Sequence, residues 1–446
     1  MYIKEIMGSN IFSYNEFSIK LNKFNVLIGP NASGKSNFIE ILDFLKDILK
    51  FGLEDAINIH GDIKFIRNIN LGSKRNLYLK FNIECEKSFR HLVVSEVINE
   101  NDNNNRNFFG FSICNFIYEL EVEFEKKNPN KWRIFEEKLF ISVDLFDMMD
   151  NKPIKNDEID FKKILKDKVA NVQIKITKGK DNLSIDYDTP EELPKMYKNF
   201  LNYSTFRTIP GDEEVNQELE SILEKKILYP ILIPVINFIK NISISKINKD
   251  NIIKTEHSKS KKRILESDAS NLKWIIDRII KDKKKKEKFI RLIRDFLPFI
   301  DTFYTKKPKK DTLELNFSEI YNSTELLPSF LLSDGTIDIT VFIILLFFER
   351  DKKLINFEEP FSHIHPQLIS KVINMMKEIT EDTEKQIILT THNPEILKFC
   401  KLEDIISVSR DNKGFSEIYK PRDKKEIETF IKNKLGIQDL FIENLL

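Results

Sequence analysis

The strongest constraint on the fold of this chain is the stretch GPNASGKS at residues 29–36. It follows the short apolar run FNVLI and precedes NFIEILDFLKDILKF, in which apolar residues recur at helical spacing. Glycines let the backbone of such a loop wrap closely around a polyphosphate, while the loop N–H groups and the helix start attract negative charge. The sequence therefore predicts a strand, a phosphate-binding loop and a helix, in that order.

Two side chains of this loop have specific chemistry. Lys35 is placed to reach the β and γ phosphates of a nucleotide, and the Ser36 hydroxyl is placed to ligate Mg²⁺. We predict that the whole nucleotide-binding segment consists of Gly29, Pro30, Asn31, Ala32, Ser33, Gly34, Lys35, Ser36 and Asn37.

Two later apolar runs end in residues that nucleotide hydrolysis requires. The run KLINF is followed by Glu358 and Glu359, and the run KQIILTT is followed by His392. Beside the phosphate loop, Glu358 would serve Mg²⁺ and Glu359 an attacking water, while His392 would contact the γ phosphate. Alone, a Glu-Glu-Pro turn is more often solvated surface and a lone histidine more often a cap. The prediction depends on finding them together.

The segment LLSDGTIDI supplies a second anion site. Ser333, Asp334 and Gly335 open the apolar run IDITVFIILLFF, which predicts a buried helix with exposed N–H groups at its start. Such a start would compete with the first loop if it met phosphate in its own chain. We therefore expect it to face a nucleotide held by another subunit.

These segments together resemble the ABC-type ATPases of the SMC, RecF and OLD-like group, and most closely the stand-alone AAA15/AAA21 ATPases of bacteria and archaea. GPNASGKSN resembles the Walker A loop, LLSDGT the signature, INFEEPFSHIHP the Walker B strand with its D-loop, and TTHNPEIL the switch-histidine segment. ESDASNLKWIIDRI resembles the helix segment that often precedes the signature. The resemblance implies ATP and Mg²⁺ as cofactors and a homodimer, or an assembly of dimers, with ATP at the interface.

The same resemblance assigns roles to single residues. It implies Lys35, Glu359 and His392 as catalytic, with Glu359 as the polarising base. It places Ser36 and Glu358 on the metal. Ser333, Asp334 and Gly335 would reach the nucleotide across the dimer.

The predicted fold class is α/β, an ABC-type P-loop ATPase head with a mixed sheet and flanking helices. Because the motifs lie at both ends of the chain, a long inserted β-plus-helical arm or lid would split the head. We expect the first part of the head at residues 1–80, the arm at 81–264, and the second part of the head with a short helical tail at 265–446.

Two departures from the family stand out. Asp338 replaces a residue that is often basic, and Arg67 and Asn68 stand where a Q-loop glutamine is expected.

Composition excludes some classes of protein. The chain has 446 residues, and 71 Lys plus Arg against 70 Asp plus Glu leave a formal charge of +1, so no global field draws it to nucleic acid or membrane. Its apolar runs are too short to cross a bilayer, which predicts a cytoplasmic protein without membrane contact. Three cysteines without a CxxC pair predict free thiols.

Three local features have two readings each. The basic clusters at residues 258–263, 281–288 and 306–310 suit a nucleic-acid backbone, although a solvated face is the commoner role in a lysine-rich chain. His363 and His365 suggest a metal site, but the D-loop interpretation is preferred. YPILIPVINFI suits a partner surface, with core packing as the default.

Two functions follow as hypotheses. The first is a dimeric, ATP-driven switch or sensor that holds a separately encoded effector, a nuclease or toxin, in an antiphage defence system. The alternative is a RecF- or SMC-like DNA-binding ATPase of DNA maintenance or repair, in which case DNA is a further partner. We expect no nuclease domain in this chain, because only a short charged and helical segment follows Ser407. A scaffold that binds ATP without turnover is disfavoured by Glu359.

Overall fold

The computed structural model describes residues 1–85, 91–93, 109–148, 165–179, 183–193, 197–198, 221–224, 229–245, 263–308, 312–424, 427 and 436–443. The chain divides into two compact units, each built from three segments. The first unit consists of Met1–Leu21, Glu40–Lys240 and Arg410–Ile418, and the second of Asn22–Ile39, Asn241–Ser409 and Tyr419–Leu446. The domain boundaries expected near residues 80 and 264 stay predictions.

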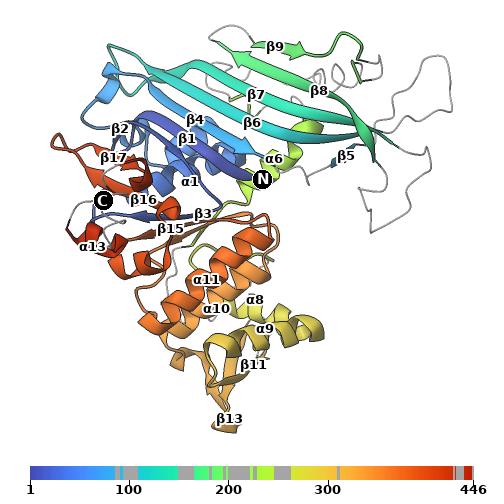
Figure 1. Ribbon diagram of the computed structural model, residues 1–446, viewed down its shortest axis with the longest axis vertical. Helices are drawn as coiled ribbons and strands as arrows, with labels where there is room; N and C mark the ends of the chain where they lie inside the picture. Colours follow the sequence, from blue (N-terminus) through green and yellow to red (C-terminus); the bar gives the residue numbers. More distant parts are fainter. Residues whose placement is uncertain are drawn as a thin grey trace. The chain divides into compact units, whose positions relative to one another are not determined.

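The first unit is built on a largely antiparallel sheet (Figure 1). Its strands follow the order β17-β2-β1-β4-β6-β7-β8-β9, with β5 paired to β6 and β17 parallel to β2. The strands are β1 (Tyr2–Ile11), β2 (Tyr14–Lys20), β4 (Leu77–Glu84), β5 (His91–Val93), β6 (Phe109–Phe124), β7 (Trp132–Met148), β8 (Leu165–Lys178), β9 (Leu183–Asp188) and β17 (Ser416–Tyr419). Its helices are most of α1 (Lys35–Phe51), then α2 (Leu53–Ile59), α3 (Ile63–Ile66), η1 (Gly72–Lys74) and α6 (Tyr229–Lys240).

The residues at the expected Q-loop position are fixed to the β1–β2 hairpin. The Asn68 side chain donates to the carbonyl of Phe12 at 2.9 Å, and its backbone N–H lies 3.2 Å from the carbonyl of Asn10. Asn10 and Phe12 both have positive φ, at 52° and 45°, which residues with a side chain rarely adopt. Asn68 therefore holds a strained turn in place, a role the sequence did not reveal.

A buried carboxylate ties residues 221–224 to this sheet. Glu137 on β7 is fully buried and accepts hydrogen bonds from the Tyr118 hydroxyl at 2.7 Å, from the Ser221 hydroxyl and from the N–H of Ile222 at 2.8 Å. Burial raises the pKa of Glu137, while these three donors lower it. The cluster anchors the segment to β7.

The second unit is built on a parallel sheet with strand order β10-β14-β15-β3-β16. Its strands are β3 (Phe24–Ile28), β10 (Ser243–Ser245), β14 (Leu354–Glu358), β15 (Gln386–Thr391) and β16 (Ile405–Arg410). A separate antiparallel sheet contains β11 (Ile300–Lys306), β12 (Glu314–Glu319) and β13 (Asn322–Pro328). The helices are α8 (Leu272–Lys281), α9 (Lys283–Phe296), α10 (Asp334–Phe347), α11 (Pro366–Asp382) and α13 (Ile437–Ile442), with short turns η2 (Ser329–Leu331), η3 (Pro394–Phe399), η4 (Leu402–Asp404) and η5 (Pro421–Asp423).

One apolar core holds the second unit together. It joins β3, β14 and β15 to side chains from α8, α9, α10 and α11, and Figure 1 shows α10 and α11 lying close together. α10 is buried from Thr336 to Leu346, as its mostly apolar sequence predicts. The predicted α/β fold class is confirmed.

One stretch of the chain differs from what its sequence predicts. The apolar spacing of residues 213–300 predicts helices throughout, but Ser243–Ser245 form β10 because they pair in parallel with Ile355–Phe357. A three-residue strand of this kind is stabilised by pairing with its neighbour rather than by the β propensity of its own residues. The polar stretch 99–107, the basic residues 258–262 and the start of the predicted helix at 213–220 lie outside the described residues. All three cysteines are described, and none of them forms a disulfide.

Candidate functional site

Three neighbouring parallel strands of the second unit end at one edge. In the register of the sheet, Glu358 of β14 lies opposite Thr390 of β15, and Thr391 lies opposite Ile28 of β3. The segments that follow these strands therefore emerge side by side. They begin with Gly29, Glu359 and His392, so the topology brings together three motifs that the sequence holds far apart.

The loop after β3 has the backbone that a phosphate cradle requires. Ala32 and Gly34 adopt φ values of 61° and 117°, and α1 begins at Lys35. Gly29 is packed so closely that an added Cβ would lie 2.0 Å from the carbonyl oxygen of Val408. Gly29 is thus required for backbone packing as well as for flexibility.

Lys35 is the buried cation of this loop. Its ammonium donates to the carbonyls of Gly29 and Pro30 at 2.8 and 2.9 Å. Burial lowers the pKa of Lys35, and the nearby charge of Glu359 raises it. The Glu359 carboxylate is therefore close enough to interact electrostatically with the loop lysine.

Glu359 has an unusual backbone that its surroundings hold in place. Its φ is 45°, its N–H donates to the carbonyl of Thr390 at 3.0 Å, and its own carbonyl accepts from the Ser362 hydroxyl at 3.0 Å. A left-handed residue with a side chain stores strain and persists where neighbours fix it. The strain is placed at the residue predicted to act as the base.

His392 holds the carboxylate of Glu359. Its Nδ1 lies 3.0 Å from Oε2 of Glu359, and its backbone N–H donates to the same oxygen at 3.3 Å. Both side chains are partly exposed, 54% for His392 and 34% for Glu359, so a ligand has access to them. The structure thus brings together the three residues predicted to be catalytic, Lys35, Glu359 and His392.

The two predicted metal ligands offer oxygen atoms. Ser36 is exposed in the first turn of α1, and Glu358 is half-buried as the last residue of β14. A hydroxyl and a carboxylate are the hard ligands that Mg²⁺ prefers, with water and phosphate oxygens completing its coordination. The donor set therefore fits Mg²⁺ by its chemistry.

The start of α10 is exposed, as the LLSDGT pattern predicts. The Ser333 hydroxyl caps this helix by accepting from the N–H of Thr336 at 3.2 Å. Ser333 and Asp334 are exposed, and Gly335 is half-buried. A Cβ added to Gly335 would lie 2.7 Å from the carbonyl oxygen of His363, so this glycine permits close packing of the Glu359–His365 turn on the helix start.

Sequence reasoning missed an electrostatic contact between this turn and α10. His363 Nδ1 lies 3.6 Å from Asp338 Oδ2, and His363 Nε2 lies 4.0 Å from Asp334 Oδ2. Asp338 is buried, which explains why its side chain needs polar surroundings. The only signal in the sequence was that Asp338 departs from the basic residue of its relatives. His365 has a separate role, because its Nδ1 caps α11 by accepting from the N–H of Gln367 at 3.4 Å.

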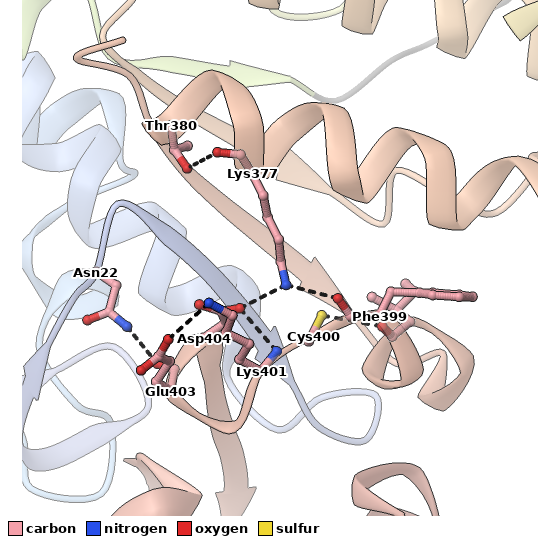
Figure 2. A network of polar contacts seen from close by, with 9 residues as sticks. Asn22, Lys377, Thr380, Phe399, Cys400, Lys401, Glu403 and Asp404 are labelled. Carbon is pink, nitrogen blue, oxygen red and sulfur yellow. Dashed lines mark hydrogen bonds and ion pairs between the residues drawn. The ribbon is translucent and has the colours of Figure 1, made fainter. Parts of the chain in front are cut away.

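A polar network fixes the segment that follows His392 (Figure 2). The Lys377 ammonium on α11 donates to the carbonyl of Phe399 at 2.9 Å and pairs with Asp404 at 3.0 Å. Asn22 donates to the carbonyl of Glu403 at 2.7 Å, which links this segment to the start of β3. Cys400 lies in the network as a buried thiol, and burial raises its pKa to about 12, which favours the protonated form.

The phosphate-loop geometry and the edge of the parallel sheet define a P-loop ATPase of the ABC type. The chain belongs to the family described as "AAA domain, putative AbiEii toxin, Type IV TA system", whose model matches residues 24–98 and 154–398. No curated protein matches the chain significantly.

Three of the solved structures that match the chain are SMC heads. An SMC head bound to the C-terminal winged-helix domain of ScpA is 14% identical, with a TM-score of 0.47, covering 94% of this chain and 98% of that one. The SMC head of Thermotoga maritima is 12% identical, with a TM-score of 0.41, covering 94% and 99%. The Pyrococcus furiosus SMC head with an extended coiled coil, bound to the C-terminal domain of ScpA, is 14% identical, with a TM-score of 0.45, covering 97% and 100%. In the described part of this chain, no helix is long and apolar enough to span a membrane.

Proposed function

We propose that the chain binds ATP with Mg²⁺ and hydrolyses it at the carboxyl edge of its parallel sheet. The observation that carries this proposal is the convergence of Lys35, Glu359 and His392 at the ends of β3, β14 and β15. Three groups with separate roles in phosphate chemistry converge on one accessible edge.

The loop Gly29–Asn37 would cradle the phosphates. On nucleotide binding, the Lys35 ammonium would exchange the carbonyls of Gly29 and Pro30 for phosphate oxygens. Ser36 and Glu358 would hold Mg²⁺, which neutralises charge on the β and γ phosphates when it is bound. Asn31, Ala32, Ser33 and Gly34 contribute their backbone to the nest.

Glu359 would orient and polarise the attacking water. The water oxygen forms a bond to the γ phosphorus while the bond to the β–γ bridging oxygen breaks, and the water proton passes to the Glu359 carboxylate. His392 keeps this carboxylate in place through its two contacts with Oε2. Because the imidazole is half-exposed, it is also placed to detect the presence of the γ phosphate.

The start of α10 would act on a second copy of the chain. Ser333, Asp334 and Gly335 present an exposed helix start, and the contacts of Ser333 are with Thr336 in its own helix. In a head-to-head homodimer, these residues would reach the γ phosphate held by the partner's loop. ATP binding would then close the dimer, and hydrolysis would open it.

The biological role we propose is control of a separately encoded effector, a nuclease or toxin of an antiphage defence system. The family description names a toxin of a toxin–antitoxin system, and a nucleotide-driven dimer suits reversible retention of such an effector. This part of the proposal predicts that the protein co-purifies with a product of its own operon and protects its host against phage. If the protein neither co-purified with such a product nor protected its host, the ATPase would have another biological role.

Solution mass of the Glu359→Gln protein, with and without ATP and Mg²⁺, tests the ATPase proposal. Removing the base should trap the closed state, so ATP is expected to convert monomer to dimer. Adding Ser333→Arg should abolish the dimer, whereas Asn322→Arg on the exposed β13 is the charge-matched control and should not. An ATP-dependent dimer that survives Ser333→Arg would overturn the role assigned to the α10 start.

A further inference from the structure

A cluster of unpaired cations occupies the corner between α8, α9 and the end of β11. We call it the corner patch, and its members are Lys283, Lys284, Lys286, Lys306 and Lys307. All are exposed except Lys286, which is half-buried. Residues 281–294 contain eight Lys or Arg against two acidic residues, in a chain whose formal charge is only +1. The local charge is thus far above the average of the molecule.

Acidic neighbours neutralise other cations nearby but not this patch. Lys281 pairs with Asp277 at 2.6 Å, Lys285 lies 3.8 Å from Asp282, and Arg294 pairs with Asp301. In the described part of the chain, no carboxylate forms an ion pair with any of the five patch lysines. The charge of Lys307 helps to lower the pKa of Asp277, so this one cation is partly offset, but none of the five lysines is neutralised by an ion pair.

The position of the lysines on α9 opposes helix stability. The first turn of α9 contains Lys283, Lys284, Lys285 and Lys286 and no acidic residue, although the N-terminal end of a helix dipole is positive. Lys283 and Lys286 also lie three residues apart on one face, where like charges repel. The Asp282 side chain caps the helix by accepting from the N–H of Lys285 at 3.1 Å, but it is a single carboxylate beside four lysines. This excess of like charge suits an anionic ligand outside the fold.

Aromatic rings lie beneath two of these cations. The Lys286 ammonium is 5.9 Å from the ring centre of Tyr304 on β11, and the Lys307 ammonium is 5.3 Å from that of Trp274 on α8. Tyr304 is 38% exposed. A base could contact the exposed part of the Tyr304 ring while Lys286 contacts a phosphate, which is how single-stranded nucleic acids are bound.

We propose that the corner patch binds a nucleic-acid strand through its phosphates. An acidic polypeptide would match the charge alone, whereas a nucleic acid matches both the closely spaced cations and the aromatic rings between them. This site is distinct from the ATPase site, and the proposal does not depend on nucleotide hydrolysis.

Fluorescence anisotropy with a labelled 20-nucleotide single strand, in nucleotide-free buffer over a series of salt concentrations, tests the proposal. The patch variant is Lys283→Glu/Lys284→Glu/Lys286→Glu. The matched control is Lys126→Glu/Lys127→Glu/Lys131→Glu, in the exposed turn between β6 and β7. We expect the patch variant to bind about tenfold or more weakly at low salt, with a salt slope smaller by about one per lysine, and the control to bind like the wild type.

Thermal unfolding separates lost binding from lost structure. Glutamate in the first turn of α9 favours the helix dipole, so the patch variant should melt at the same or a higher temperature than the wild type. A more stable protein that binds DNA less well supports a binding role for the lysines. Equal weakening in both triple variants, or competition by polyglutamate as strong as by unlabelled DNA, would overturn the proposal.

Discussion

His392 Nδ1 lies 3.0 Å from Oε2 of Glu359, and the backbone N–H of His392 donates to the same oxygen. One end of β15 therefore orients the residue that follows β14. Glu359 also has a strained backbone, with a φ of 45°, which the contacts of its N–H and carbonyl hold in place.

The contact between these two residues predicts non-additive kinetics. Glu359→Gln should lower kcat by about 10²–10⁴-fold by removing the base, while ATP binding is retained. His392→Ala should also lower kcat, because it releases the same carboxylate. The double variant should be little slower than Glu359→Gln alone, as measured by phosphate release under saturating ATP. Multiplying effects would mean that the two residues act independently.

Gly29 packs against the backbone of β16, so we expect this position of the phosphate loop to tolerate no larger residue. A methyl group there would meet the carbonyl oxygen of Val408 at 2.0 Å and the Ser33 hydroxyl at 2.9 Å. Gly29→Ala should destabilise the protein by about 1–3 kcal/mol and abolish ATP binding, because a backbone atom must move. Thermal unfolding and binding of a fluorescent ATP analogue measure the two effects. Gly179→Ala is the control, since an added Cβ there has nothing within 4 Å.

Much of this site could be predicted because its parts are local patterns. An apolar run of strand length followed by a glycine-rich loop or by Glu-Glu identifies β3 and β14 without knowledge of their neighbours. The shared edge then follows from parallel pairing. By contrast, the contact of Gly29 with Val408 depends on how β16 lies beside β3, and β10 exists only through its pairing with β14. Periodicity within a segment carries no information about such contacts.

The contact between Asp338 and His363 also depends on tertiary packing. It predicts that reversing the charge at Asp338 lowers stability and that a second change at His363 restores part of the loss. Asp338→Arg should destabilise the protein by about 3–5 kcal/mol, because it puts a cation in a buried position beside the imidazole. Adding His363→Glu should recover part of the loss, as measured by chemical denaturation. Asp334→Arg is the comparison, since Asp334 is 55% exposed and 4.0 Å from His363, and it should cost less than 1 kcal/mol. No recovery in the double variant would show that Asp338 owes its stability to other groups.

Lys385 is a buried cation that hydrogen-bonds to carbonyl groups at and just beyond the carboxyl end of α10. Its ammonium donates to the carbonyls of Leu345 at 2.8 Å, Glu349 at 2.6 Å and Lys352 at 3.1 Å. Burial lowers its pKa from 10.5 to about 8, with smaller effects from neighbouring charges. Lys385→Met should destabilise the protein at pH 7, because three carbonyls lose their shared donor.

The lowered pKa of Lys385 also fixes how this destabilisation changes with pH. Between pH 8 and pH 10.5 the unfolded chain binds more protons at this lysine than the folded one, so the free energy of unfolding rises with pH. The rise is at most about 3 kcal/mol at 1.36 kcal/mol per pKa unit, and the Met variant lacks it. The difference in unfolding free energy between wild type and Lys385→Met should therefore be larger at pH 10 than at pH 7 in urea titrations. Lys398→Met on the surface is the control and should differ from the wild type equally at both pH values. A difference for Lys385→Met that stays constant with pH would mean that Lys385 keeps an ordinary pKa in the folded protein.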